Sequence, residues 1–312
     1  MDKTLCYMFF FVSALILMSG SFSFATEVTH TGGAYMSAPP PEDTDSTDDA
    51  DNSMAAEKIC VVGITKGGYP PFVYIYPNGA TDGFDVRVIS WIAHEAGFKV
   101  KYYPKDWANI IPTLKAKEID MIASAMTITE ERKKEINFTI PYWNISEVLV
   151  VRKNSNLQIR TTLANNNKIG VAKGTVAADW IEKNLFKGGK QIELVYYDSE
   201  IAAIEDVISG KIAAAAMDDT AARHIAKTKP VKTIGRYGLP DAVLGYAVRK
   251  EDTAFLETLD TGISRLMSSL YWRVNKLKYF SRQQKAKKKY GKETFSRKVT
   301  RENYIDTAIS YK

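Results

Sequence analysis

Residues 119–132 read IDMIASAMTITEER and join a short apolar run to the start of a helix. Four of the six residues 119–124 are apolar, which predicts a buried strand. Thr127 and Glu130 then stand three positions apart, the spacing of a capping box, in which two side chains bond the first backbone N–H groups of a helix. The stretch therefore predicts a strand that leads directly into a helix.

The same strand-to-helix pattern recurs along the chain. Strands are predicted at residues 58–64, 99–103, 147–152, 168–172, 192–197, 212–217, 231–234 and 243–248. Helices are predicted from an Asp85 cap to Gly97, around residues 110–114, over 175–186, from an Asp198 cap to Gly210, from Asp219, and over 252–270. This alternation predicts an α/β fold of parallel sheets with helices on both faces. Because the series restarts after residue 152, we expect two lobes, whose interface is a favoured place for a small ligand.

The composition is typical of a soluble globular chain, and the charge gives no evidence that its body binds nucleic acid. The 312 residues are 45% hydrophobic and 25% charged, which suits about two domains. The net charge of +6 is concentrated in residues 281–312, which hold ten basic and three acidic residues. The basic balance thus belongs to a C-terminal tail, and we predict no nucleic-acid partner.

The sequence lacks the usual motifs of metal and nucleotide binding. The two cysteines, Cys6 and Cys60, and the three histidines show no metal-ligand spacing. No GxxxxGK[ST] loop occurs, and no GxGxxG follows a strand. We therefore expect neither a metal nor a cofactor.

The N-terminal residues predict export. Residues 5–24 carry no charge, and a small-x-small pattern ends at Ala25, so residues 1–25 are predicted to be a cleaved signal peptide and the mature chain periplasmic. An uncleaved membrane anchor is the alternative, since the stretch is long enough to span a bilayer. Residues 26–56 are acidic and Pro-rich with few large apolar residues, which predicts a disordered linker.

Seven short motifs occur in order over about residues 58–280. They are YPPF (69–72), GFDV (83–86), DWANIIP (106–112), SAMTITEER (124–132), PY (141–142), KGT (173–175) and YDS (197–199). Together they resemble the polar amino-acid-binding proteins of bacterial transport systems, extracellular solute-binding protein family 3. The resemblance implies a two-lobed, type II periplasmic binding protein-like fold, with lobe 1 at 57–149 plus 246–280 and lobe 2 at 150–245. The two doubly wound lobes would be joined by a two-segment hinge near Val150-Val151 and Tyr246-Ala247.

An amino-acid ligand carries a carboxylate and an ammonium, and each must be paired once it leaves water. Arg132 suits the carboxylate because its planar guanidinium donates two parallel hydrogen bonds. The resemblance assigns this clamp to Arg132 and the ammonium-binding acid to Asp218, although Asp219 is adjacent and either acid can simply cap a helix. Ser124, the Ala125 carbonyl and Thr127 would add further ligand contacts, with Thr127 also capping its helix.

The remaining expected site residues come from other motifs. The backbone amides of Thr175 and Val176 would bind the ligand carboxylate at a helix start, and the rings of Tyr69 and Trp107 would enclose the ligand side chain. Core packing is the other interpretation of both rings.

Two residues bear on selectivity. The resemblance places Lys66 where members that bind cationic amino acids often carry an acid, which argues for a neutral or acidic ligand. Met217 would line the side-chain pocket without adding charge.

The predicted function is capture of a polar amino acid by lobe closure, without catalysis, and its delivery to an inner-membrane ABC permease. Ligand capture by closure needs only a monomer. Two other classes stay open: a cleft enzyme of the same fold, like the cyclohexadienyl dehydratases, and a membrane-anchored amino-acid sensor.

Overall fold

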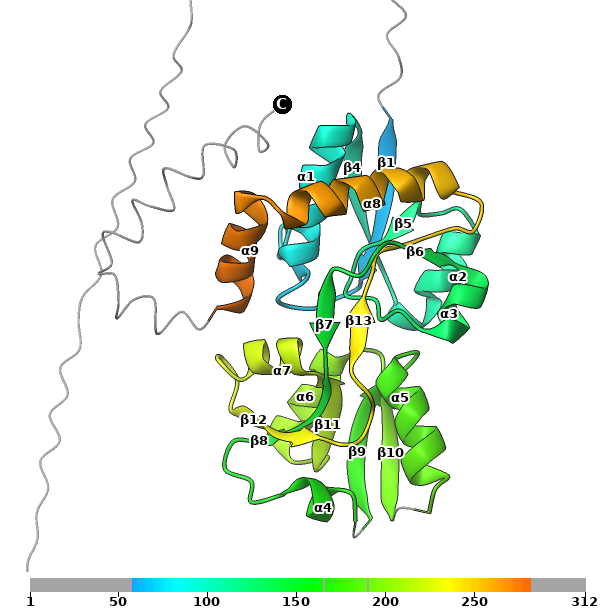
Figure 1. Cartoon of the computed structure of the whole chain (residues 1–312). Coiled ribbons are helices and arrows are strands. Elements are labelled where there is room, and N and C mark those ends of the chain that lie inside the picture. The colour runs from blue at the N-terminus through cyan, green and yellow to red at the C-terminus, as the bar shows by residue number, and fades with distance from the viewer. Residues whose placement is uncertain (1–57, 165, 190, 282–312) are drawn as a thin grey trace, which may run out of the picture. The chain divides into compact units, whose positions relative to one another are not determined.

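Two five-stranded sheets define the two lobes of the chain (Figure 1). The structure is a computed structural model that describes residues 58–281 except 165 and 190. The predicted signal peptide, the predicted linker and the tail beyond Ser281 lie outside the described residues. Within the described part, no helix is both long and apolar enough to cross a membrane.

The first sheet has the order β4-β1-β5-β14-β6. Its strands are β4 (Lys99–Lys105), β1 (Ile59–Thr65), β5 (Met121–Ile122), β14 (Ala247–Val248) and β6 (Asn137–Phe138). Its helices are α1 (Phe84–Ala96), η1 (Trp107–Asn109), α2 (Ile110–Lys115), α3 (Glu130–Glu135), α8 (Thr253–Met267) and α9 (Leu270–Phe280). A short hairpin, β2 (Tyr74–Ile75) with β3 (Thr81–Asp82), precedes α1. Buried residues of α1 and α8 share a core with β1, whereas those of α2 belong to a separate core, so the sheet is covered on both faces.

The second sheet has the order β10-β9-β11-β8-β12. Its strands are β10 (Ile192–Tyr197), β9 (Asn167–Ala172), β11 (Ala214–Asp218), β8 (Glu147–Arg152) and β12 (Val231–Arg236). Its helices are α4 (Ile159–Thr162), α5 (Val176–Ile181), the π-helical turn η2 (Glu182–Phe186), α6 (Glu200–Ser209) and α7 (Asp219–Ile225). Along β8, Val148 and Val150 share a core with α6 and α7, while Leu149 and Val151 share one with α5. This alternation is the period of two expected for a strand buried on both faces.

The sheets are parallel, as predicted, in only part of their strand pairs. β1 runs parallel to β4 and β5, and β9 runs parallel to β10 and β11. However, β14 is antiparallel to both of its neighbours, and so is β8. These two strands enter their sheets from the other lobe and not through the helical crossover that parallel neighbours need, so they can run antiparallel.

The two lobes are connected by paired strands. β7 (Trp143–Ile145) and β13 (Ala242–Leu244) form an antiparallel pair between the sheets (Figure 1). The lobe limits 57–149 plus 246–280 and 150–245, with hinges at Val150-Val151 and Tyr246-Ala247, stay a proposal. All of β8, including Val150 and Val151, belongs to the second sheet. The chain therefore first crosses between the lobes before β8, at β7.

The start of α1 differs from its prediction. Gly83 precedes the helix in place of an Asp85 cap, with φ of 132° and a position where an added Cβ would lie 2.2 Å from the Phe72 carbonyl oxygen. Glycine is required there because a side chain would collide with the backbone. Asp85 instead lies inside the first turn and is fully buried.

Other helix and strand ends also shift from the predicted positions. Thr129, not Thr127, caps α3, and Ser199, not Asp198, caps α6; in each case the side chain accepts a backbone N–H three residues later. The predicted strand at 119–124 shortens to β5, and that at 243–248 divides into β13 and β14. The last predicted helix ends at Met267, and α9 begins anew after a Ser269 cap.

Candidate functional site

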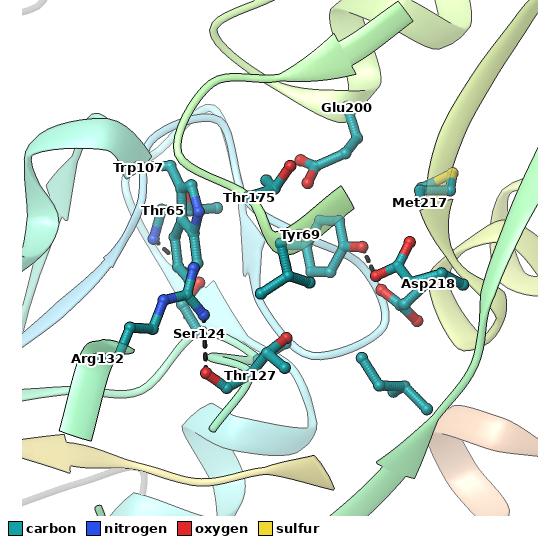
Figure 2. A pocket seen from close by; sticks show the side chains of 14 residues that line it. Thr65, Tyr69, Trp107, Ser124, Thr127, Arg132, Thr175, Glu200, Met217 and Asp218 are labelled. Atoms are coloured by element: carbon teal, nitrogen blue, oxygen red, sulfur yellow. Dashed lines mark hydrogen bonds between the residues drawn. The ribbon is translucent and has the colours of Figure 1, made fainter. Parts of the chain in front are cut away.

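A pocket between the lobes is lined from both of them (Figure 2). It contains all nine residues proposed for ligand binding: Tyr69, Trp107, Ser124, Ala125, Thr127, Arg132, Thr175, Val176 and Asp218. Met217 lines it as well, and so do four residues that were not predicted: Thr65, Ile145, Glu147 and Glu200. Most of these residues follow the carboxyl ends of strands, the position at which open α/β sheets bind ligands.

The Arg132 guanidinium lies where the two lobes approach each other. It donates to the Thr127 carbonyl oxygen at 2.7 Å in its own lobe and to the Gly174 carbonyl oxygen at 3.0 Å in the second. Its central carbon is 5.7 Å from the Trp107 ring centroid, and the Trp107 indole N–H donates to the same Gly174 oxygen at 3.1 Å. Burial lowers the pKa of Arg132 to about 10, so the group stays a cation at neutral pH and presents N–H donors to the pocket.

Gly174 allows this close approach. Its φ is 73°, in the left-handed region, and a Cβ placed on it would lie 3.2 Å from the Ala108 Cα of the first lobe. A larger residue would therefore be strained and would also press against the opposite lobe.

The loop after β5 carries Ser124, Ala125 and Thr127. The Ser124 hydroxyl accepts from the Thr65 N–H at 3.1 Å, which ties this loop to the end of β1. Ala125 has a left-handed φ of 52°, uncommon for a residue with a side chain, and its N–H donates to Asp85 at 2.8 Å. Thr127 pairs with Leu244 rather than capping a helix, because the cap of α3 lies two residues later.

In the second lobe, Thr175 caps α5. Its hydroxyl accepts from the Ala178 N–H at 3.2 Å and donates to the Ala172 carbonyl oxygen at 2.8 Å. The Thr175 N–H is itself directed at the Ala172 carbonyl oxygen, at 3.4 Å. Val176 begins the helix, so its N–H belongs to the turn whose donors have no acceptor within the helix and are suited to an anion.

Asp218 caps α7 at the end of β11. One carboxylate oxygen accepts from the Thr220 and Ala221 N–H groups, both at 2.9 Å, and the other accepts from the Tyr69 hydroxyl of the first lobe. Figure 2 shows Tyr69 between Arg132 and Asp218. The two groups proposed for the charged ends of an amino acid thus border one pocket from different lobes.

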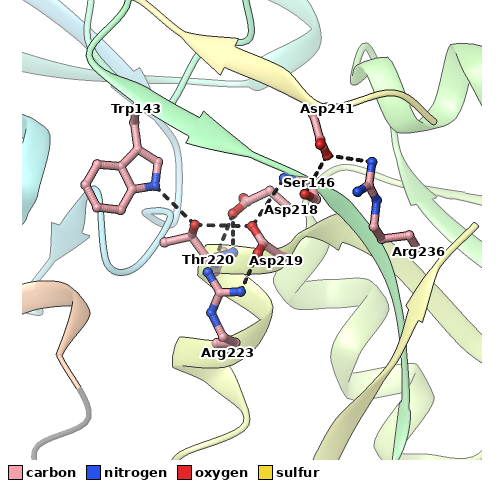
Figure 3. A network of polar contacts seen from close by, with 9 residues as sticks. Trp143, Ser146, Asp218, Asp219, Thr220, Arg223, Arg236 and Asp241 are labelled. Carbon is pink, nitrogen blue, oxygen red and sulfur yellow. Dashed lines mark hydrogen bonds and ion pairs between the residues drawn. The ribbon is translucent and has the colours of Figure 1, made fainter. Parts of the chain in front are cut away.

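The neighbouring Asp219 points elsewhere (Figure 3). It accepts from the Ser146 N–H at 3.3 Å and forms an ion pair with Arg223. Asp219 does not line the pocket, so the geometry favours Asp218 over Asp219 as the acid that faces a ligand.

Glu147 and Glu200 were missed by sequence reasoning. Glu147 begins a buried strand and Glu200 follows a helix cap, and at both positions a glutamate is ordinarily solvated. Burial raises the pKa of Glu200 to about 7, and burial with repulsion from Asp218 and Glu200 raises that of Glu147 well above its usual range. The pKa of Asp218 is raised by burial as well. The pocket therefore holds three carboxyl groups and one guanidinium.

Lys66 does not line the pocket. Its side chain is 71% exposed, and its ammonium lies 3.5 Å from Asp106. Met217 is buried and does line the pocket. The argument against a cationic ligand, which rested on Lys66, consequently loses its structural basis.

Comparison with known proteins identifies the family to which this chain belongs. A model of bacterial extracellular solute-binding proteins, family 3, matches residues 61–282. The L-arginine-binding protein of Pseudomonas aeruginosa is 30% identical over 239 residues, which span 73% of this chain and 90% of that protein. The chain therefore belongs to the bacterial extracellular solute-binding proteins, family 3.

Two solved structures share the fold. An ancestral arginine-binding protein bound to arginine matches with a TM-score of 0.66 and 28% identity, covering 72% of this chain and 99% of that one. An ancestral amino acid-binding protein, a precursor of cyclohexadienyl dehydratase, matches with a TM-score of 0.66 and 26% identity over 72% and 96% of the two chains. These likenesses confirm the predicted two-lobed α/β fold.

Proposed function

We propose that this protein captures a free amino acid between its lobes in the periplasm and delivers it, as a monomer and without catalysis, to an inner-membrane ABC permease. One observation carries the proposal: Arg132 and Asp218, of opposite charge, border the same pocket from different lobes. A zwitterion satisfies both groups at once only when the lobes are together, which couples binding to closure. The amino-acid-binding relatives support the same conclusion.

The acidic residues of the pocket also indicate the charge of the ligand side chain. Once Arg132 and Asp218 are paired with a zwitterion, Glu147 and Glu200 remain as acids within the same pocket. Glu147 is buried and Glu200 is partly buried. Carboxylates withdrawn from water are unfavourable without a cation, so we propose a side chain that is cationic or rich in N–H donors. This replaces the neutral or acidic ligand expected from Lys66. The relatives that bind arginine are consistent with it.

Calorimetric titration of the purified chain against the twenty amino acids tests this function. We expect tight binding of a polar amino acid that is lost in Arg132→Ala and in Asp218→Ala. Asp219→Ala and Arg236→Ala are matched controls, because these residues are an acid and an arginine of the second lobe that lie outside the pocket. Loss of binding in the controls, or its survival in Arg132→Ala, would refute the assignment.

A cleft enzyme is the second candidate. Glu200 favours it, because a partly buried carboxyl with a pKa of about 7 suits a general acid. Turnover of prephenate or arogenate by the purified chain, abolished in Glu200→Gln, would establish this function in place of non-catalytic capture.

A further inference from the structure

Asp85 is a buried acid that lies behind the pocket. It is the second residue of α1, is fully buried, and does not itself line the pocket. One carboxyl oxygen accepts from the Ala125 N–H at 2.8 Å, and the other lies 3.3 Å from the Tyr246 hydroxyl, so both oxygens bond neutral donors. Burying a carboxyl group costs free energy, and these two hydrogen bonds offset part of that cost.

The first bond fixes a peptide that faces the pocket. Ala125 holds a left-handed backbone conformation, which residues with a side chain rarely adopt unless their surroundings impose it. The Asp85 carboxyl accepts the N–H of this residue and so sets the plane of its peptide. The direction of the following carbonyl, proposed to accept from a ligand ammonium, depends on that same backbone conformation.

The second bond reaches the segment that returns from the second lobe. Tyr246 lies between β13 and β14, its N–H donates to the Thr139 hydroxyl at 3.0 Å, and its ring stacks on Tyr142 at 4.4 Å. The adjoining Gly245 N–H donates to the Met126 carbonyl oxygen at 3.0 Å. The loop is therefore held at Ala125 by Asp85 and at Met126 by the returning segment.

We propose that Asp85 is a positioning residue of the amino-acid site: through the Ala125 N–H it holds the loop after β5 in the conformation that presents the Ala125 carbonyl to the ligand. The role in binding rests on the proposed function. The effect of Asp85 on the backbone at Ala125 does not depend on that function, because the hydrogen bond from the Ala125 N–H to Asp85 forms without any ligand.

The test compares Asp85→Ala with Asp85→Asn, which keeps an oxygen acceptor for Ala125. A matched control is Val88→Ala, a truncation in the core of the same helix away from the pocket. Two quantities are measured: the Kd for the amino acid that the wild-type chain binds, and the hydrogen-exchange protection of the Ala125 amide without added ligand.

Asp85→Ala leaves a buried N–H without a partner, so we expect the Kd to rise about tenfold or more. We expect Asp85→Asn and Val88→Ala to stay within about threefold, a change below 1 kcal/mol. Protection of the Ala125 amide should fall in Asp85→Ala alone. Adding Ala125→Gly to Asp85→Ala should recover part of the affinity, because glycine takes the left-handed conformation without strain.

Unchanged protection of the Ala125 amide in Asp85→Ala would overturn the positioning role. An equal loss of affinity in Val88→Ala would also overturn it, since general destabilisation would then suffice. If the wild-type chain binds no amino acid while Ala125 protection still depends on Asp85, the proposed function fails and the hold on the backbone stands.

Discussion

Glu200→Gln tests whether the pocket selects for positive charge. The substitution keeps the size of the side chain and an oxygen acceptor but removes the negative charge. If a cationic ligand group meets Glu200, the variant should lose affinity for that cation and keep affinity for its uncharged counterpart. Arginine and citrulline form such a pair, because they differ mainly in charge at the end of the side chain.

The magnitude follows from the environment of Glu200. Burial raises its pKa from 4.5 to about 7, so its ionised form is disfavoured by about 3 kcal/mol relative to water. A ligand cation at hydrogen-bond distance offsets much of this cost, because hydrogen bonds to charged groups contribute about 1.5–3 kcal/mol. We therefore expect the ratio of arginine to citrulline affinity to fall about tenfold or more in the variant.

The assay is calorimetric titration of both ligands at pH 6 and pH 8. The wild-type ratio should rise with pH as Glu200 ionises, whereas the Glu200→Gln ratio should change less. Glu193→Gln is the matched control, since Glu193 lies on β10 of the same lobe with its side chain 56% exposed and 3.3 Å from Lys168. An arginine-to-citrulline ratio that stays within twofold in Glu200→Gln, or tight binding of acidic amino acids alone, would refute the reasoning.

Three further predictions concern other groups. Arg132→Lys replaces a forked donor by a point charge, so we expect the Kd to rise about 10- to 100-fold by calorimetry, and an unchanged Kd would contradict the clamp. Tyr69→Phe removes the donor that links the first lobe to Asp218, so we expect about a three- to tenfold weaker Kd, and tighter binding would contradict it. Burial raises the pKa of Asp85 to about 7, so the folded chain holds this proton more tightly than the unfolded chain and loses stability as pH rises towards 7. In urea titrations, Asp85→Asn should gain about 2 to 3 kcal/mol in free energy of unfolding relative to wild type between pH 5 and pH 8, and a gain of zero would exclude the raised pKa.

Local patterns were enough to predict most of the strands and helices. β8 and β10 begin and end where their apolar runs predicted. The glycine stops of α1 and α6 also hold, with Gly97 and Gly210 both left-handed. The motif residues lie in the loops that follow strands, and the fold brings these loops to one pocket.

What the sequence could not predict depends on contacts between distant segments. β14 pairs with β5 and β6, and no local pattern reports the direction of such a pairing. Glu147 and Glu200 resemble solvated acids in the sequence, and only the fold brings them into one pocket with Asp218. Lys66 is adjacent to a pocket residue, Thr65, yet its long side chain turns to solvent and Asp106, which position in the sequence does not reveal.

The order of strands in the first sheet also constrains how the chain folds as the ribosome synthesises it. β14, near residue 248, lies between β5 and β6, strands made more than a hundred residues earlier. Until β14 emerges, the edges of these two short strands lack their partner, whereas every strand of the second sheet has already been synthesised. The second lobe can therefore complete its sheet first, and the first lobe is completed only when β14, α8 and α9 have been synthesised.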